Sequence, residues 1–402
     1  MHGDQIVVIG AGLAGLRAAE RLREQGHTGP VTVIGDEPHR PYNRPPLSKQ
    51  VLAGRMEPDE LRLRTHGART DVEVDWVLGD GARSVSPRHR TVTLRSGRDI
   101  SYDGLIIASG VEARTLPDAP TDLPNVQTLR TLADCRAIDQ AMTRADSIAI
   151  IGGGFIGCEV ATSARQRALT TTIIDISPTL LGHAVGTEVG QIVTGIHRKA
   201  GVNLCLGRHV ETFQQHDGSL TLRLDDGNIV NADVVVIGVG TRPRVEFLAG
   251  LGLDLTDGVL CTPTCHVIGL DDAVAAGDCA RWPNLRFDEH PYRVEHWINA
   301  VEHARAAADA LLDGPSQAEP FAPIPRFWSE QHDIKIQSIG MPRLADRVTL
   351  TERDPRSHRT IATYHRGDDL VGVIAIDEPR RLLDYTRELT NSIGRPVITR
   401  AA

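Results

Sequence analysis

Two glycine fingerprints of the form Gly-x-Gly-x-x-Gly restrict the folds that are open to this chain of 402 residues. They occupy residues 10–15 (GAGLAG) and 152–157 (GGGFIG), each between an apolar run typical of a buried strand and a run typical of a helix. In this context the glycines allow a tight turn and let backbone N–H groups approach a pyrophosphate at a helix N-terminus. The pattern predicts two strand–turn–helix units that each hold a dinucleotide, or, as the alternative, two such units without a ligand. The phosphate-binding glycines would be Gly10, Gly12, Gly15, Gly152, Gly154 and Gly157.

An acidic residue lies about twenty positions behind each fingerprint, where a second strand would end. These residues are Asp36, with Glu37 beside it, and Asp175. A carboxylate at this position accepts hydrogen bonds from ribose hydroxyls and repels a 2′-phosphate. No arginine or lysine occurs between residues 176 and 197 to receive such a phosphate. Asp175 therefore predicts NADH rather than NADPH, and the two sets together predict an enzyme that passes electrons between two dinucleotides.

The bulk composition excludes several other classes of protein. The net charge of −8 and the isoelectric point of about 6.1 argue against a general nucleic-acid surface. No run of 18 apolar residues and no secretion signal is visible, so we expect no membrane span. Six scattered cysteines suit a reducing, cytoplasmic setting. The 16 histidines form no cluster at zinc-like spacing, so we expect no metal site.

The apolar periodicity predicts an α/β fold with the nucleotide unit duplicated. The first unit is expected as strand, helix and strand at 5–9, 13–25 and 31–34, and the second at 148–151, 155–168 and 171–174. A short apolar strand at 273–280 and a helix at about 295–312 should return the chain to the first unit. A tail domain should follow, with strands near 334–339, 348–351, 360–365 and 370–376 and a helix near 379–392.

Seven segments, in order along nearly the whole chain, carry a resemblance to a known family. They are IVVIGAGLAG (6–15), RPPLSK (44–49), IIGGGFIGCEVA (150–161), GVGTRP (238–243), AAGDCA (275–280), VEHWINAVEHARAAA (294–308) and FWSEQHDIKIQSIG (327–340). The chain resembles the FAD-dependent, NAD(P)H-using ferredoxin reductases of bacterial oxygenase systems. The resemblance implies the glutathione reductase fold: an FAD domain (1–112 and 245–320), an inserted NAD domain (113–244) and a C-terminal α+β interface domain (321–402).

The resemblance also assigns residues to each cofactor. FAD would lie on the first fingerprint, with Asp36 at the adenosine ribose, Asp278 at the ribityl chain, and Arg44 and Lys49 at the flavin or its phosphates. Ala82 and Ser109 complete this expected set, Ser109 replacing the threonine usual in the family. NADH would lie on the second fingerprint with Asp175 and Gly240. Asp278 as a simple strand end, and Arg44 and Lys49 as exposed loop cations, are the alternatives.

Four residues are expected around the reacting atoms. By resemblance Glu159 reaches the nicotinamide and pairs with Lys49 near flavin N5, where positive charge stabilises the reduced flavin. Trp297 and Trp328 would lie at the isoalloxazine edge, and the alternative is that each is a core residue. Three departures from the family could change cofactor or partner choice: Thr179, Glu330 and His332.

The loop at 38–49 contains no cysteine, whereas disulfide reductases of this fold carry a cysteine pair there. Electrons should therefore leave directly from the reduced flavin, after a hydride from NADH, as single electrons to a [2Fe–2S] ferredoxin serving a monooxygenase or dioxygenase. Residues 321–402 hold 13 Lys and Arg against 11 Asp and Glu, so charge-steered transient docking there is expected. The candidate docking cations are Arg380, Arg381, Arg387 and Arg395.

Two other functions remain open at this point. The flavin could instead reduce a small acceptor such as a quinone, a radical or oxygen. The chain could also be a redox-sensing binding protein similar to apoptosis-inducing factor, in which slow NADH oxidation sets an oligomeric or charge-transfer state. For the reductase we expect a monomer or a weak dimer.

Overall fold

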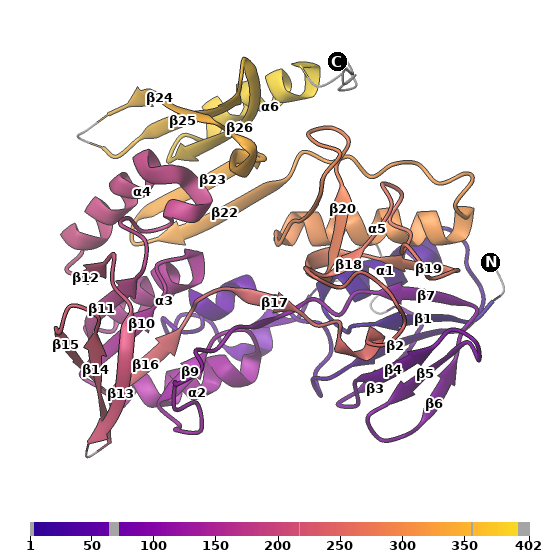
Figure 1. Cartoon of the computed structure of the whole chain (residues 1–402), viewed down its shortest axis with the longest axis horizontal. Coiled ribbons are helices and arrows are strands. Elements are labelled where there is room, and N and C mark those ends of the chain that lie inside the picture. The colour runs from indigo at the N-terminus through magenta and orange to yellow at the C-terminus, as the bar shows by residue number, and fades with distance from the viewer. Residues whose placement is uncertain (1–3, 64–71, 217, 355–356, 393–402) are drawn as a thin grey trace.

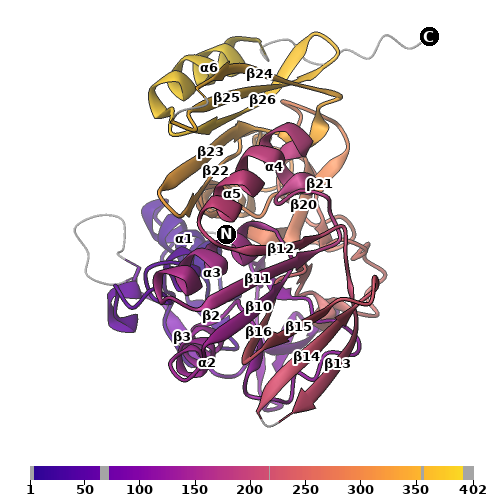
Figure 2. The ribbon, with the colours of Figure 1, turned by 90° about the vertical axis from the view of Figure 1, so that its left-hand side faces the viewer.

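The computed structural model describes residues 4–63, 72–216, 218–354 and 357–392. The chain forms three units, and the C-terminal unit lies above the other two in both views (Figures 1 and 2). The first and second units are each built on a parallel five-stranded sheet, and the C-terminal unit on an antiparallel one. The expected α/β class with a C-terminal α+β domain is confirmed.

The first unit has the strand order β19-β7-β1-β2-β3 with layers on both faces. Alternate residues of β1 serve the two faces: Ile6 and Val8 pack with the helices α1 and α5, while Val7 and Ile9 pack with the sheet β4-β5-β6. Because β19 pairs with β7, the chain returns to the first unit as predicted. The bounds are β1 Ile6–Ile9, α1 Leu13–Glu24, β2 Val31–Gly35, β3 Asp75–Leu78, β4 Ala82–Ser86, β5 Thr91–Leu94, β6 Asp99–Ser101, β7 Gly104–Ile107, β19 Ala273–Ala275 and α5 Trp297–Asp313.

The second unit repeats this design with the strand order β12-β11-β10-β16-β9. Ile148 and Ile150 of β10 pack with the helices, while Ala149 and Ile151 pack with the antiparallel sheet β13-β14-β15. The bounds are β9 Val126–Thr128, α2 Leu132–Met142, β10 Ser147–Ile151, α3 Phe155–Gln166, β11 Thr170–Asp175, α4 Gly182–Lys199, β12 Asn203–Leu206, β13 Val210–His216, β14 Ser219–Leu224, β15 Ile229–Ala232 and β16 Val234–Ile237.

The C-terminal unit has the strand order β22-β23-β26-β25-β24, and α6 packs on β26 and β23. Its bounds are β22 Arg326–Gln331, β23 Ile334–Gly340, β24 Arg347–Arg353, β25 Thr360–Arg366, β26 Asp369–Ile376 and α6 Pro379–Ser392. The remaining strands form a two-stranded link between the first two units, β8-β17, and a small sheet, β18-β20-β21. They are β8 Val111–Ala113, β17 Thr241–Pro243, β18 Val259–Leu260, β20 Ala280–Pro283 and β21 Pro291–Arg293. Short 3₁₀ helices span Pro45–Ser48, Pro58–Leu61, Glu246–Leu248, Gly277–Cys279 and Pro342–Leu344.

The sequence did not predict helix α4, although it is the longest helix among the described residues. Leu181 precedes it in a left-handed conformation, and Gly186 interrupts it at φ 76°. Its sequence is rich in glycine and β-branched residues, which have low helix propensity. Burial of Val185, Val189 and Val193 against the core holds it as a helix. In the part of the chain that the structure describes, no helix is long and apolar enough to cross a bilayer.

Candidate active site

A cavity of about 1260 Å³ extends along the three units and is lined by both fingerprint turns. It is larger than the ~300–1,000 Å³ of an ordinary small-molecule pocket, so it has room for a large ligand and part of a second. Thirteen of the predicted site residues line it: Gly10, Gly12, Asp36, Arg44, Lys49, Ala82, Ser109, Gly154, Glu159, Gly240, Asp278, Trp297 and Trp328. The predicted residues that do not line it are Gly15, Gly152, Gly157 and Asp175.

The glycines of the first fingerprint have two different roles. A Cβ atom on Gly15 would lie 1.8 Å from the Gly10 carbonyl oxygen, so this glycine lets the helix pack closely on the turn. Gly10 has φ +122°, and a Cβ there would lie 2.1 Å from the Ala108 carbonyl oxygen. A Cβ on Gly12 meets nothing within 4 Å. The turn at Gly12 is thus an open cradle beside the N-terminus of α1, which suits a pyrophosphate.

The second fingerprint has the same division of roles. A Cβ on Gly157 would lie 1.9 Å from the Gly152 carbonyl oxygen, and one on Gly152 would lie 2.3 Å from the Gly238 carbonyl oxygen. Gly154 faces open space and lines the cavity. Gly152 and Gly157 therefore shape this turn from behind, which explains why they are absent from the cavity wall.

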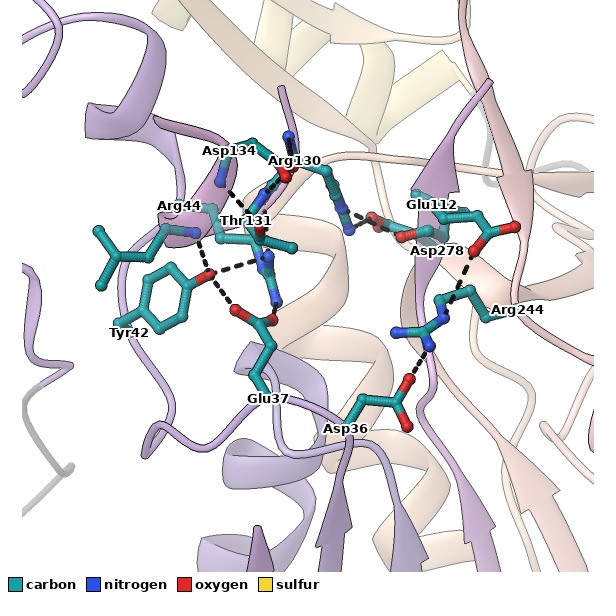
Figure 3. A network of polar contacts seen from close by, with 12 residues as sticks. Asp36, Glu37, Tyr42, Arg44, Glu112, Arg130, Thr131, Asp134, Arg244 and Asp278 are labelled. Atoms are coloured by element: carbon teal, nitrogen blue, oxygen red, sulfur yellow. Dashed lines mark hydrogen bonds and ion pairs between the residues drawn. The ribbon is translucent and has the colours of Figure 1, made fainter. Parts of the chain in front are cut away.

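We call the part of the cavity next to the first fingerprint turn its first half. Acidic residues and arginines pair with one another along this half (Figure 3). Asp36 pairs with Arg244, and more loosely with Arg95 at 3.4 Å. Glu37, one residue on, accepts hydrogen bonds from Arg44 at 2.5 Å and from the Tyr42 hydroxyl at 2.6 Å. Arg44 is therefore a partly buried, ion-paired residue of the cavity wall and not a free loop cation.

Arg130 also lines the cavity, and the sequence reasoning missed it. Its guanidinium lies 3.0 Å from Asp278, so Asp278 projects into the cavity and does not simply close a strand. Thr131 and Asp134 form a capping box at the start of α2, and Asp134 accepts a hydrogen bond from the Arg130 backbone. The Thr-x-x-Asp spacing could have pointed to Arg130. It marks a helix N-terminus at residue 131, and so an ordered loop that ends at Arg130.

The acid of the second fingerprint has different partners. Asp175 accepts hydrogen bonds from the backbone N–H of Gly153 and from that of Ser177, the latter at 2.6 Å. The carboxylate thus braces the turn, and the neighbouring Arg208 pairs with Asp225 and Asp226 instead. Thr179 is buried, and its hydroxyl lies against Gly190.

The predicted pair of Lys49 and Glu159 is present, with Nζ 2.7 Å from Oε2. Glu159 is only 3% exposed, on the first turns of α3. Two serines that the sequence reasoning missed also donate to it: Ser48 to Oε2 at 2.5 Å and Ser329 to Oε1 at 2.6 Å. Ser48 and Lys49 belong to the first unit, and Ser329 to β22 of the C-terminal unit. The three units therefore meet at this one carboxylate.

Aromatic side chains form the wall next to this pair. The rings of Trp297 and Trp328 meet edge to face with centroids 6.2 Å apart, and Trp297 donates to Asn43 at 2.9 Å. The Nδ1 atom of His296 is buried with no hydrogen-bond partner among the described residues, and burial lowers its pKa to about 4. A neutral imidazole with an unsatisfied nitrogen in the cavity wall suits a polar ligand group. Glu330 and His332 do not line the cavity.

The cysteines lie away from the cavity wall, and all six are free thiols. Burial raises the pKa of the thiols of Cys135 and Cys265 to about 12, and it also raises the pKa of Cys158. Such thiols are poor nucleophiles. Over the residues that the structure describes, no group of three or more His, Cys, Asp and Glu side chains could hold a metal ion.

Comparison with known proteins identifies the family. Residues 4–304 match the pyridine nucleotide-disulphide oxidoreductase family, and residues 326–396 match the reductase C-terminal domain. The chain is 33% identical to rhodocoxin reductase of Rhodococcus erythropolis over 377 residues, covering 93% of this chain and 87% of the relative. It is 35% identical over 337 residues to the biphenyl dioxygenase system ferredoxin–NAD(+) reductase component of Paraburkholderia xenovorans (strain LB400), covering 84% and 81%.

A solved structure agrees with these matches. The reductase in the covalent putidaredoxin reductase–putidaredoxin complex superposes with a TM-score of 0.89 at 29% identity, covering 97% of this chain and 93% of that chain. The resemblance inferred from the seven segments is thereby confirmed. The chain belongs to the pyridine nucleotide-disulphide oxidoreductase family.

Proposed function

We propose that this chain is an NADH:ferredoxin reductase. The observation that carries the proposal is the buried Lys49–Glu159 pair in a cavity that joins both fingerprints and has no cysteine in its wall. FAD, when bound, supplies a group that can take up two electrons as a hydride and give them out one at a time. The matched relatives named as ferredoxin–NAD(+) reductase components support this choice of reaction.

We propose that the first half of the cavity holds FAD. The open turn at Gly12 would cradle the pyrophosphate, and Asp36 would accept hydrogen bonds from the adenosine ribose after releasing Arg244. Asp278 would hold the ribityl chain, with Arg130 fixing its orientation. Arg44, Ala82 and Ser109 complete the wall of this half. The fit rests on the open glycine cradle and on the unsatisfied Nδ1 atom of His296.

NADH would enter at the second fingerprint, over Gly154 and Gly240. Asp175 lies just outside the cavity wall, but each of its oxygens accepts one backbone N–H and keeps a further acceptor position. It would accept the ribose hydroxyls and repel a 2′-phosphate, which favours NADH over NADPH. Glu159 would hold the nicotinamide carboxamide, and the Lys49 ammonium would place positive charge where reduction adds negative charge. The chain's contribution at this point is orientation and electrostatics.

The kind of electron acceptor is inferred from the cavity wall, which holds no cysteine that could pass electrons on as a disulfide. With all six cysteines buried or half-buried and none in the cavity wall, electrons would leave through the edge formed by Trp297 and Trp328. A [2Fe–2S] ferredoxin serving a monooxygenase or dioxygenase fits a one-electron acceptor, and the solved complex of the relative with putidaredoxin supports it. The free thiols also support a cytoplasmic location.

We also propose the division into an FAD domain (1–112 and 245–320), an NAD domain (113–244) and an interface domain (321–402). Pairing of β19 with β7 supports the split first domain, and the pair β8-β17 supports crossing points near residues 112 and 242. The expected docking patch on α6 has weaker support. Arg380, Arg381 and Arg387 are exposed, but α6 lies at the outer end of the molecule (Figures 1 and 2), and Arg381 pairs with Glu352. Arg395 lies outside the described residues.

The test is cytochrome c reduction by the purified protein with NADH and a panel of [2Fe–2S] ferredoxins. We expect reduction to depend on one of the added ferredoxins. Equal rates without any ferredoxin, or with a quinone in its place, would instead support reduction of a small acceptor. Very slow flavin reduction with tightly retained NAD⁺ would support a redox sensor.

A further inference from the structure

The carboxylate of Glu159 is held by more donors than its pairing with Lys49 requires. An ionised carboxylate has about four lone-pair positions and only accepts hydrogen bonds. Ser48 and Lys49 together occupy Oε2, and Ser329 occupies one position on Oε1. One acceptor position therefore remains, and it is on Oε1.

The donor Ser329 is itself the end of a longer chain of hydrogen bonds. Its single hydroxyl proton points at Glu159, so its oxygen accepts from the amide of Gln331, at 3.0 Å. The amide nitrogen is thereby fixed on the Ser329 side, and the Gln331 carbonyl oxygen faces Nε2 of His197 at 3.0 Å. His197 must then carry its proton on Nε2, and its Nδ1 accepts from Nε2 of His332 at 3.2 Å.

Every donor in this row of hydrogen bonds points toward Glu159. Ser329, Gln331 and His197 are all at most 1% exposed, so the bonds from His197 through to Glu159 are made without competition from water. Burial lowers the pKa of His197 to about 4, which keeps its ring neutral at neutral pH. The chain also ties two units together, because His197 lies on α4 of the second unit and Gln331 on β22 of the C-terminal unit.

The row of hydrogen bonds from His332 to Glu159 does not serve as a proton path. A carboxamide such as that of Gln331 donates through nitrogen and accepts through oxygen, so it does not pass a proton between its two neighbours as a hydroxyl or an imidazole does. Its effect is instead to fix the direction of the Ser329 hydroxyl and so the rotation of the Glu159 carboxylate.

We propose that Ser329, Gln331 and His197 are positioning residues that hold Glu159 so that the remaining acceptor position on Oε1 receives the carboxamide N–H of the nicotinamide. This inference rests on the proposed function and extends it, because it gives the C-terminal unit a part in the hydride-transfer half of the reaction. Orientation of this kind contributes to rate because a misplaced donor loses near-attack geometry.

The experiment compares Ser329→Ala with Ser338→Ala. Ser338 is a matched control: it lies on the neighbouring strand β23, is buried, and its hydroxyl has no partner among the described residues. Gln331→Met keeps the side-chain volume and removes the amide, which guards against a folding defect in one variant. The readouts are the limiting rate of anaerobic flavin reduction by NADH, the dissociation constant of NAD⁺ from calorimetry, the melting temperature, and flavin reduction by dithionite.

We expect Ser329→Ala to slow reduction by NADH roughly tenfold, the size of one lost hydrogen bond to a charged group, and Gln331→Met to slow it less. NAD⁺ binding should weaken in the same order, while the rate of dithionite reduction matches that of Ser338→Ala. The melting temperature should fall below that of Ser338→Ala, because each substitution leaves a buried polar partner unpaired. In a double-mutant cycle with Glu159→Gln, Ser329→Ala should add no further loss, because it acts through that carboxylate.

Two results would overturn the inference. If Ser329→Ala and Gln331→Met match Ser338→Ala in the NADH reduction rate, the chain does not position Glu159. If Ser329→Ala slows reduction equally in the Glu159→Gln background, it acts by another route. In both cases the wild-type protein would still be reduced by NADH, so the proposed function would stand; a wild-type flavin that NADH does not reduce would overturn both.

Discussion

The two fingerprint turns share a sequence pattern and a backbone design, but their surroundings differ. In each, the outer glycines pack against backbone carbonyls and the middle glycine, Gly12 or Gly154, opens to the cavity. Around the first turn the acid Asp36 pairs with Arg244, whereas around the second Asp175 is bonded to backbone N–H groups. Neither fingerprint helix lines the cavity with a cation, and arginines of the cavity wall near the first turn come from neighbouring loops: Arg44, Arg130 and Arg244.

The difference fits a cofactor that stays and a nucleotide that comes and goes. Arginines in the cavity wall can add charge-assisted hydrogen bonds to an anionic ligand, which would slow its release. A turn that offers mainly backbone N–H groups binds the same group more weakly and releases it between turnovers. On the proposed assignment, the same motif would support two residence times because of what the neighbouring loops contribute.

Substitution of the packed glycine of each turn should have the strongest consequences, and these should differ between the two turns. Gly15→Ala should abolish flavin binding, because its methyl group would meet the Gly10 carbonyl at 1.8 Å. Gly157→Ala meets the Gly152 carbonyl at 1.9 Å and should retain the flavin while losing reduction by NADH. The measurements are the flavin absorbance per protein and the anaerobic reduction rate.

Gly12→Ala and Gly154→Ala are the controls, since their methyl groups meet no protein atom within 4 Å. They should leave the melting temperature of the apoprotein unchanged while weakening the ligand on their own side. Equal loss of flavin in both packed-glycine variants would contradict the assignment of the two turns.

Substitution of Asp175, the acid behind the second fingerprint, should have a smaller effect on catalysis. Asp175→Ala should lower kcat/KM for NADH about tenfold or more and narrow the preference over NADPH, because ribose acceptors and the repulsion of a 2′-phosphate are both lost. Steady-state kinetics with the two nucleotides measure this. A wild-type protein with the higher kcat/KM for NADPH would contradict the role of Asp175.

Acid stability should reflect three histidines whose pKa is lowered by burial. The pKa falls to about 4 for His197 in α4 and for His296 just before α5, and to about 3 for His303 in α5. The unfolded chain binds these protons first, near pH 6.5, so the free energy of unfolding should fall below that pH by about 1.4 kcal/mol per pH unit for each histidine. Urea unfolding at pH 7 and pH 5.5 measures the slope, and His303→Phe should reduce it by one proton.

The smallest expected effect concerns the partner. If docking is steered by charge, raising the salt concentration should raise KM for ferredoxin while the flavin reduction rate stays constant. Arg380→Glu on α6 should matter little, because that helix lies at the outer end of the C-terminal unit (Figure 1). A KM that does not respond to salt would remove charge steering from the account.

The sequence predicted the elements whose signal is local. The glycine turns and the strands of the C-terminal sheet from β23 onward could be inferred from pattern. The Lys49–Glu159 pair joins residues more than a hundred positions apart and could be inferred from the resemblance alone. The strand β22 was missed as an element although Trp328 was expected at the site. Arg130 and Ser329 were also missed, because each reaches the site by tertiary contact with a partner more than a hundred residues away. No periodicity in the chain reports such contacts.

The central claim is that a flavin held by the first unit takes electrons from NADH held by the second, with no sulfur between them. The most direct test is anaerobic addition of NADH to the purified yellow protein, followed by visible absorbance in a stopped-flow instrument. We expect the flavin to bleach at least as fast as steady-state turnover with ferredoxin, and to do so equally in a variant with Cys135 and Cys158 replaced by alanine. A colourless protein that takes up no FAD, or a yellow colour that survives NADH, would contradict this claim.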